Sequence, residues 1–317
     1  INMRSKKNLD EFLSQFDVDS SFKNSRPIVL SAHDPIRYLG DVLAYVHSLI
    51  VNEADFVKSL FKFQDKHIEN TPKSILQENK EFLKGLDNKV LNDIFNSLAN
   101  STRIRLEQIV RFEDNAIVNF EITQLLKLYQ LMFEKYGISN ESSMVSNLND
   151  LEKLADVKIL TAFLASLEKV DTSGQIGTEL LPPEWLSDHF NKVVELFEKY
   201  EQSGALDDKN GLLDRTFLEK VILNPVENIL IKQIQSHFPF AKKNEEEKIK
   251  MLILEINCFD MIKSRLAPFH STIFGEEYCR EIYDKVISYL DTFTKQLQEV
   301  QNRHIFEKTG LFLYNNL

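Results

Sequence analysis

Residues 34–61 read DPIRYLGDVLAYVHSLIVNEADFVKSLF and contain the most regular hydrophobic pattern in the chain. Apolar residues recur along this stretch at Ile36, Leu39, Leu43, Val46, Ile50, Ala54, Val57 and Phe61. The 25 residues from first to last are covered in seven steps, or about 3.6 residues a step, the period of an α-helix. Asp is a favoured N-cap residue and Pro is favoured at the first helical position. The stretch therefore predicts a long helix that starts at Asp34-Pro35 and buries one face.

Glycine and proline are scarce in the rest of the chain as well. Together they make up 9 + 8 = 17 of 317 residues, whereas roughly 12% is usual for the pair. Sheets need frequent tight turns, and these two residues supply most of them. Disorder is also disfavoured, because 43% of the residues are hydrophobic and 23 are Phe. The composition predicts an all-α protein, an elongated rod of stacked antiparallel helical bundles.

Turn-forming residues divide the expected helices into two groups. Gly174, Gly177, Pro182 and Pro183 gather in residues 171–183, the best internal boundary in the chain. We expect a polar, partly ordered N-terminal segment at 1–30, a first bundle at 31–170, a linker or long loop at 171–183 and a second bundle at 184–317. The patterns predict helices near 9–16, 34–61, 74–111 with a break near Gly85, 115–136, 141–170, 186–200, 214–238 with a kink or break at Pro225, 244–266 and 276–304.

The charge balance is acidic, with 38 basic and 48 acidic residues and a net charge of −10. Proteins that bind along the phosphate backbone of a nucleic acid carry an excess of basic residues. We therefore expect no nucleic-acid partner, and only indirect association with membranes. Two cysteines, Cys258 and Cys279, are too few for a disulfide framework and indicate a reducing compartment, where both act as small apolar residues. The first residue is Ile1 rather than Met, which indicates a fragment.

The sequence contains no recognisable catalytic, cofactor or metal motif. Without a Gly-Lys pair it has no phosphate-binding loop, and both Gly-x-Ser-x-Gly and His-Glu-x-x-His are missing. None of the seven histidines follows a Glu by three positions, as a di-iron bundle requires. Residues 206–211 resemble a calcium loop, but the ligand positions fall on Leu206 and Phe217. We expect no enzyme, no cofactor and no bound metal.

Two polar pairs at the start of the long helix have simple structural interpretations. His33 beside Asp34 could form a general base with its orienting carboxylate, but a cap residue next to a packed imidazole is the simpler hypothesis. Arg37 and Asp41 are four residues apart and can pair across one helical turn. Neither pair by itself predicts chemistry.

Three further features are also interpreted as structural. Trp185 follows Pro182-Pro183 and suits a hydrophobic anchor at a helix start. Residues 242–248 are highly charged and suit a solvated helix start with acids in the first turn. Leu126, Leu128, Leu131 and Phe133 lie off the main apolar stripe of 115–136, so we expect that helix to be buried on more than one side.

The start of the long helix also resembles the signature of a known family. Residues 33–47 follow, over fifteen consecutive positions, the order His-Asp-Pro, aliphatic, Arg-Tyr, aliphatic, Gly-Asp, aliphatic, Leu-Ala, aromatic, aliphatic, His. This order closely resembles that of subunit 6 of the conserved oligomeric Golgi complex. Weaker similarities occur at 105–110, 223–225 and 309–315. The signature residues that we single out are His33, Asp34, Pro35, Arg37, Tyr38, Gly40, Asp41 and His47.

The resemblance implies a non-catalytic subunit of a multisubunit vesicle tether, peripheral on the cytosolic face of Golgi membranes. Such tethers act in retrograde intra-Golgi transport through contacts with sister subunits and SNARE proteins. Members of this family carry an N-terminal coiled coil and continue beyond the position of the similarity at 309–315. The resemblance therefore implies that this chain is the C-terminal part of such a subunit and that its second bundle is truncated. A generic all-α adaptor outside trafficking, or an all-α enzyme with a dispersed site, remains the alternative.

The family motif implies no catalytic role, so we predict that the signature caps and packs helices. His33, Asp34 and Pro35 would start the long helix. Gly40 would allow a neighbouring backbone to approach closely.

Overall fold

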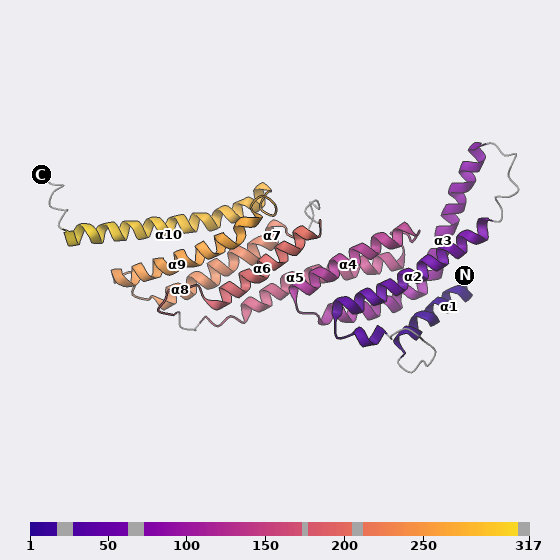
Figure 1. Cartoon of the computed structure of the whole chain (residues 1–317), viewed down its shortest axis with the longest axis horizontal. Coiled ribbons are helices and arrows are strands. Elements are labelled where there is room, and N and C mark those ends of the chain that lie inside the picture. Colours follow the sequence, from indigo (N-terminus) through magenta and orange to yellow (C-terminus); the bar gives the residue numbers. More distant parts are fainter. Residues whose placement is uncertain (18–27, 63–72, 173–176, 205–211, 310–317) are drawn as a thin grey trace. The chain divides into compact units, whose positions relative to one another are not determined.

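The computed structural model describes residues 1–17, 28–62, 73–172, 177–204 and 212–309 (Figure 1). All regular secondary structure within these ranges is helical, which confirms the prediction of an all-α protein. The chain divides into two compact units, Ile1–Ile159 and Leu160–Leu317. The division falls within helix α5 (Ser143–Glu168). In the described ranges, every helix is too short or too polar for a membrane span.

The helices of the first unit begin and end close to the residues that the sequence predicts. They are α1 (Asn2–Leu13), α2 (Pro35–Lys62), α3 (Lys73–Phe112), α4 (Ala116–Lys135) and the first part of α5, with short 3₁₀ turns at Ser14–Phe16 and Ile28–Ser31. Helix α1 starts seven residues before the predicted position. The predicted break at Gly85 is wrong, because α3 runs through it. A glycine inside a helix costs only about 1 kcal/mol, which a helix of 40 residues can absorb.

One hydrophobic core joins the helices of the first unit. The predicted face of α2 lies in it, with Leu39, Leu43 and Ile50 fully buried. The same core contains Leu106 of α3 and Phe133 of α4. Phe61, the last residue of the predicted face, has a side chain outside the described part of the chain. The apolar period of the sequence therefore identifies the packed side of α2.

Helix α4 buries two of the four apolar residues that lie off its main stripe, so the predicted burial on more than one side holds for only half of them. Its off-stripe residues Leu126 and Phe133 are buried, but Leu128 and Leu131 are 51% and 65% exposed. The prediction for these two leucines is wrong, because the neighbouring helix α5 meets α4 on another face. There the Thr123 hydroxyl donates to the Asp156 carboxylate at 3.1 Å.

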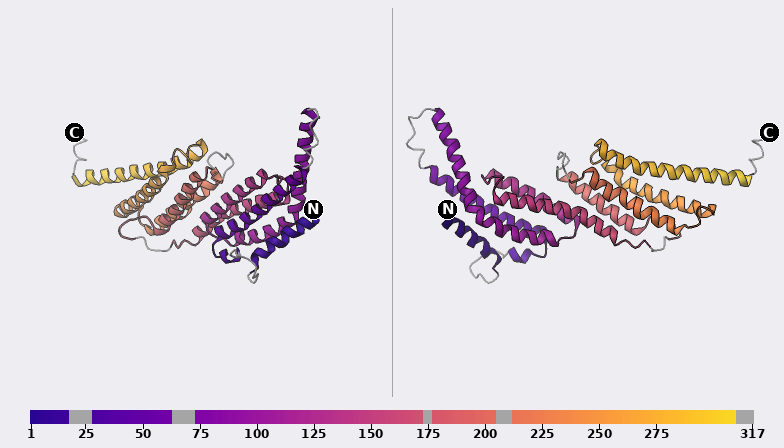
Figure 2. Two further views of the ribbon diagram at one scale, coloured as in Figure 1. Left: turned by 45° about the vertical axis from the view of Figure 1, so that its right-hand side comes forward. Right: turned by 180° about the vertical axis from the view of Figure 1, so that it is seen from behind.

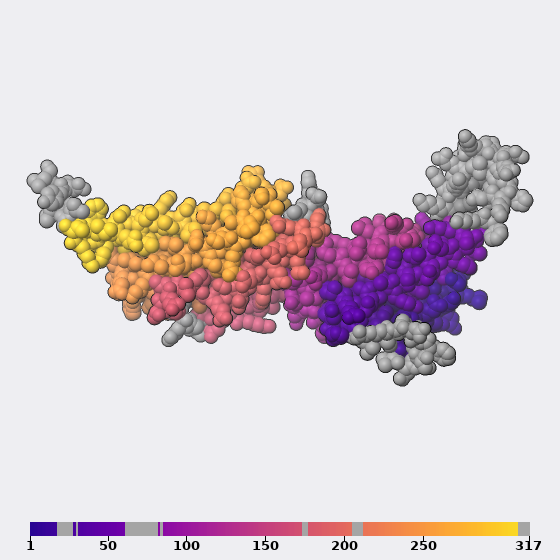
Figure 3. All heavy atoms as spheres, in the orientation of Figure 1, coloured from indigo at the N-terminus to yellow at the C-terminus, as the bar shows by residue number. Residues whose placement is uncertain are grey.

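The second unit continues from the end of α5 through a series of helices. They are α6 (Glu184–Gln202), α7 (Arg215–Leu218), α8 (Ile231–His237), α9 (Glu245–Leu266) and α10 (Glu277–Thr309), with a 3₁₀ turn at Ala267–Phe269. The ribbon views and the space-filling view show α10 lying along α9 (Figures 2 and 3). These two helices are antiparallel, since Phe293 packs on Phe259 at 5.3 Å and His304 pairs with Glu245.

The residues that the sequence assigns to the interior of the second unit are buried. Leu186, Phe190, Val193, Phe197 and Tyr200 form the inner face of α6, as predicted. Both thiols, of Cys258 and Cys279, are free and buried, which agrees with their interpretation as small apolar residues. Residues 205–211, which contain most of the calcium-like segment, lie outside the described residues.

Pro225 widens the helix that contains it without breaking it. Two π-helical turns, Glu219–Leu223 and Val226–Leu230, flank Asn224 and Pro225 and connect α7 to α8. Proline has no N–H to donate, and its ring collides with the carbonyl four residues earlier. Wider turns relieve this collision and let the helical path continue. The predicted break at Pro225 is wrong, because helical residues continue without interruption from Arg215 to His237.

Candidate functional site at the start of helix α2

The signature begins with a capped helix start. The Asp34 carboxylate accepts a hydrogen bond from the backbone N–H of Arg37 at 3.1 Å. The backbone carbonyl oxygen of Asp34 accepts one from the N–H of Tyr38 at 2.9 Å. Pro35 is the first residue of α2, where its missing N–H has no partner to lose. Asp34 thus satisfies one of the donors that every helix start leaves unpaired.

Asp41 binds a residue that precedes the helix. The hydroxyl of the buried Ser31 donates to the Asp41 carboxylate at 2.6 Å. Within the described chain, no ion pair joins Asp41 to Arg37, so the predicted pair across one turn is wrong. The Arg37 side chain is exposed instead. The Ser31–Asp41 bond fixes the 3₁₀ turn at 28–31 against α2.

A shallow pocket of about 420 Å³ lies over this part of the first unit. Arg37 and Asp41 line it from α2, and Gln15 and Tyr45 line it as well. The Gln15 amide donates to the Tyr45 hydroxyl at 3.1 Å. The pocket therefore presents one guanidinium, one carboxylate and neutral polar groups, a set suited to hydrogen bonding.

Tyr38 connects the signature to the N-terminal segment and, through it, to α3. Tyr38 is buried and its ring lies 6.5 Å from that of Phe16. The Arg105 guanidinium of α3 lies over the same Phe16 ring, 3.6 Å from its centre. Arg105 begins the similarity at 105–110, so the structure brings two family-like segments together through one phenylalanine.

His47 packs among aromatic rings of α4. Its imidazole lies 5.2 Å from the ring of Tyr136, 6.3 Å from that of Tyr129 and 6.4 Å from that of Phe133. Burial lowers the pKa of His47, which favours the neutral ring. Its Nε2 atom is buried without a hydrogen-bond partner in the described chain. The ring acts here as a packing surface between α2 and α4.

Gly40 is less tightly enclosed than the sequence predicts. A Cβ atom added at this position would come within 4 Å only of the Leu125 side chain, at 3.9 Å, which is an ordinary van der Waals contact. The described neighbours of Gly40 therefore include no backbone in close approach. His33 is exposed at the surface, so the prediction that its imidazole is packed is wrong.

Two further sets of polar contacts in the first unit were not foreseen from the sequence. The Arg4 guanidinium of α1 makes a bidentate ion pair with Glu53 of α2, whose side chain is only 2% exposed. Arg4 also lies over the Phe56 ring at 4.5 Å. The only sequence signal for this pair is an acidic residue on the otherwise apolar face of α2.

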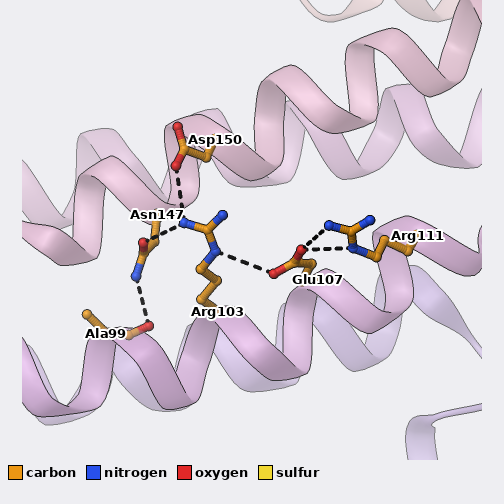
Figure 4. A network of polar contacts seen from close by, with 6 residues as sticks. All are labelled: Ala99, Arg103, Glu107, Arg111, Asn147 and Asp150. Atoms are coloured by element: carbon orange, nitrogen blue, oxygen red, sulfur yellow. Dashed lines mark hydrogen bonds and ion pairs between the residues drawn. The ribbon is translucent and has the colours of Figure 1, made fainter.

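The second set is a polar network that connects α3 to α5 (Figure 4). Arg103 of α3 donates to Asn147 at 3.0 Å and to Asp150 at 3.1 Å. Along α3, Glu107 accepts from Arg103 and from Arg111. The spacing Arg103, Glu107, Arg111 is the i, i+4 pattern of helix ion pairs and could have indicated the part within α3.

The contacts around the signature are those of capping and packing. Among the described residues, no three His, Cys, Asp or Glu side chains gather as a metal site would require. Tyr38, Asp41 and His47 contact the N-terminal segment, the preceding turn and α4, whereas His33 and Arg37 are exposed. The fold defines a class: an all-α protein built of packed helices.

A protein-family model, described as "Conserved Oligomeric Golgi complex subunit 6, C-terminal", matches residues 1–317. The chain belongs to this family. It is 53% identical over 322 residues to the conserved oligomeric Golgi complex subunit 6 of Saccharomyces cerevisiae (strain ATCC 204508 / S288c), covering 99% of this chain. The relative of the same name from Vanderwaltozyma polyspora is 49% identical, and that from Kluyveromyces lactis is 46% identical, each over 100% of this chain.

The chain corresponds to only part of these relatives. It spans 38% of the length of the S. cerevisiae and V. polyspora proteins and 40% of the K. lactis protein. No solved structure matches the chain.

Proposed function

We propose that this chain is part of a non-catalytic subunit of the conserved oligomeric Golgi complex and acts through protein–protein contacts. The match of the family model to all 317 residues carries this proposal. The relatives are named as subunits of that complex, so the proposed partners are its other subunits. Tethering of vesicles in retrograde intra-Golgi transport, with contacts to Golgi SNARE proteins, is the finer part of the proposal.

The signature supports a structural role within this subunit. Asp34 caps α2, Asp41 binds the preceding turn, and His47 packs on α4. These groups act on neighbouring parts of the first unit. We propose that the signature sets the direction in which the chain enters α2, and that partners bind elsewhere on the surface.

The outer face of α4 is the part of the first unit that we assign to partner contact. Leu128 and Leu131 are adjacent on this face and largely exposed, although they belong to an otherwise well-packed helix. Apolar side chains that gather at a surface are typical of protein interfaces. Burial of both leucines under another subunit would account for their exposure here.

The proposed location is the cytosolic face of Golgi membranes, with peripheral attachment through the partners. The net charge of −10 disfavours direct binding to anionic lipids, which supports indirect attachment.

Co-purification tests the proposal. The folded chain is mixed with the other subunits of the complex and, separately, with soluble domains of Golgi SNARE proteins. We expect at least one subunit to co-purify, and less of it with the variant Leu128→Ser/Leu131→Ser. A matched control is Leu13→Ser, which changes an exposed leucine of α1. A folded chain that retains none of these proteins would contradict the proposal and favour an adaptor outside trafficking.

A further inference from the structure

A second pocket lies in the Leu160–Leu317 unit, and none of its lining residues belongs to the signature. Its volume is about 560 Å³. Trp185, at the start of α6, lines it together with Leu181, Pro182 and Pro183. Three carboxylates complete the lining: Asp171, Glu179 and Glu184, all on exposed residues. None of the described residues that line the pocket is a Lys or an Arg.

The aromatic wall of this pocket is fixed in place. The Trp185 indole N–H donates to the Gln233 side-chain oxygen at 2.9 Å, and Gln233 is itself buried. The polar edge of the indole is thereby satisfied inside the protein, while the residue stays partly exposed. The sequence predicts Trp185 to be a hydrophobic anchor at a helix start; it is also a wall of an open pocket.

The chain segment that carries the carboxylates is held as well. Leu180 has a φ of +53°, a left-handed conformation that costs a residue with a side chain about 1 to 3 kcal/mol. The Asn257 amide of α9 donates to the Leu180 carbonyl at 2.9 Å and holds it there. Glu179 and Leu181, which flank this residue, are thus presented to the pocket by a backbone that the fold keeps in place.

A fixed aromatic ring beside carboxylates matches one kind of ligand group. An arginine side chain stacks on aromatic rings through its flat cation and pairs with carboxylates through its N–H groups. Carboxylates repel the phosphates of lipids and nucleic acids. A metal ion needs several ligand atoms directed at one position. Among the described residues, no group of three or more His, Cys, Asp or Glu side chains is placed to hold one, here or elsewhere.

We infer that the pocket between Trp185 and the carboxylates of Glu179 and Glu184 binds an arginine side chain from a basic segment of a partner protein. Charge complementarity and the preformed aromatic wall carry this assignment. The site is distinct from the α2 signature and does not depend on which complex the chain belongs to.

Trp185 is the only tryptophan of the chain, so its fluorescence reports on this pocket alone. The 317-residue chain is titrated with a capped seven-residue peptide that contains two arginines among Gly and Ser. The matched peptide has citrulline, a neutral analogue of the same shape, in place of arginine. We expect a saturable change in Trp185 emission with the arginine peptide, and binding at least about tenfold weaker with citrulline.

Paired variants separate the pocket from general charge. Glu179→Gln/Glu184→Gln removes two carboxylates of the pocket and is expected to weaken binding about tenfold. Glu195→Gln/Glu198→Gln makes the same change in net charge at exposed sites of α6 outside the pocket, and should leave binding within about twofold. An unsaturable signal, equal binding of the citrulline peptide, or equal weakening by both double variants would overturn the inference.

Discussion

The Nε2 atom of His189 lies 2.7 Å from the carbonyl oxygen of Val221. In a regular α-helix this carbonyl would accept a hydrogen bond from the backbone N–H of residue 225. Here that residue is Pro225, which has no N–H. His189 comes from α6, so a second helix donates to a carbonyl about one helical turn before Pro225. A carbonyl only accepts, so Nε2 carries the hydrogen. Burial lowers the pKa of His189, which keeps the imidazole neutral.

This relationship predicts that His189 and Pro225 are energetically coupled. His189→Leu should lower the free energy of unfolding by about 1 to 3 kcal/mol, because it leaves a buried carbonyl short of a donor. In the background of Pro225→Ala, which restores a backbone N–H, the same substitution should cost less. Urea unfolding of the parent chain, the two single variants and the double variant measures the cost of His189→Leu in each background. Equal costs of His189→Leu in both backgrounds would show that the coupling does not exist.

A buried carboxyl predicts how the stability depends on pH. Burial raises the pKa of Glu255 to about 7, and one of its carboxyl oxygens has no hydrogen-bond partner in the described chain. The folded chain holds this proton more tightly than the unfolded chain, so Glu255 lowers the free energy of unfolding as pH rises from about 4.5 to about 7. Above about pH 7 Glu255 is charged in the folded chain, and the full cost of burying that charge lowers the free energy of unfolding.

Glu255→Gln removes the titrating group and keeps the shape of the side chain. We expect this variant to be more stable than the parent chain at pH 8, by on the order of 2 kcal/mol, and to differ little at pH 4.5. Thermal unfolding at the two pH values measures this. Glu246→Gln, an exposed change on the same helix, serves as the control. A stability gain that is equal at both pH values would contradict the assignment to Glu255.

The signature predicts that Asp41 acts with Ser31 rather than with Arg37. Ser31→Ala and Asp41→Ala should each cost about 1 kcal/mol, and the double variant about as much as either single one, because both remove the same hydrogen bond. Arg37→Ala should change the free energy of unfolding by less than about 0.5 kcal/mol. Chemical denaturation provides these values. Loss of partner binding by a stable, folded Arg37→Ala would instead make the signature a recognition site.

Two glycines should respond to alanine in opposite directions. Gly40 lies inside α2 with space for a Cβ atom, so Gly40→Ala should stabilise the chain by about 0.5 to 1 kcal/mol. Gly137 ends α4 with a φ of +97°, and an added Cβ atom would overlap the Asn88 side chain. Gly137→Ala should therefore destabilise by more than about 1 kcal/mol. Melting temperatures distinguish the two, and a destabilising Gly40→Ala would restore the tight packing predicted from the sequence.

Local signals in the sequence predict much of the fold. Asp34, Asn115 and Asn244 stand at helix starts and cap α2, α4 and α9, because short polar side chains reach the free N–H groups of a first turn. The acids after Asn244 lie in the first turn of α9, as predicted. Periodic apolar residues also identify the buried faces of α2 and α6.

The errors arise where distant parts of the chain decide the outcome. Arg37 and Asp41 have the right spacing for a pair, but Ser31 offers Asp41 a nearer donor from another turn. Leu128 and Leu131 look like core residues, yet the placement of α5 leaves them exposed. Spacing along one helix cannot show which neighbouring element covers it.

The same limit applies to the candidate sites. The signature locates the start of α2 from sequence order alone, but the packing of His47 among α4 aromatics depends on tertiary structure. The pocket beside Trp185 needs Gln233, 48 residues later in the chain, and no local pattern connects the two.

An exchange experiment tests the proposed function most directly. The matching segment of the S. cerevisiae relative, 53% identical to this chain, is replaced by residues 1–317, and the tagged chimera is isolated from cells that lack the original subunit. We predict that it retains the other subunits of the complex in the same proportions as the unaltered protein, and that an Arg37→Ala chimera does so too. A stable, folded chimera that retains none of them would contradict the proposal that this chain works through contacts within that complex.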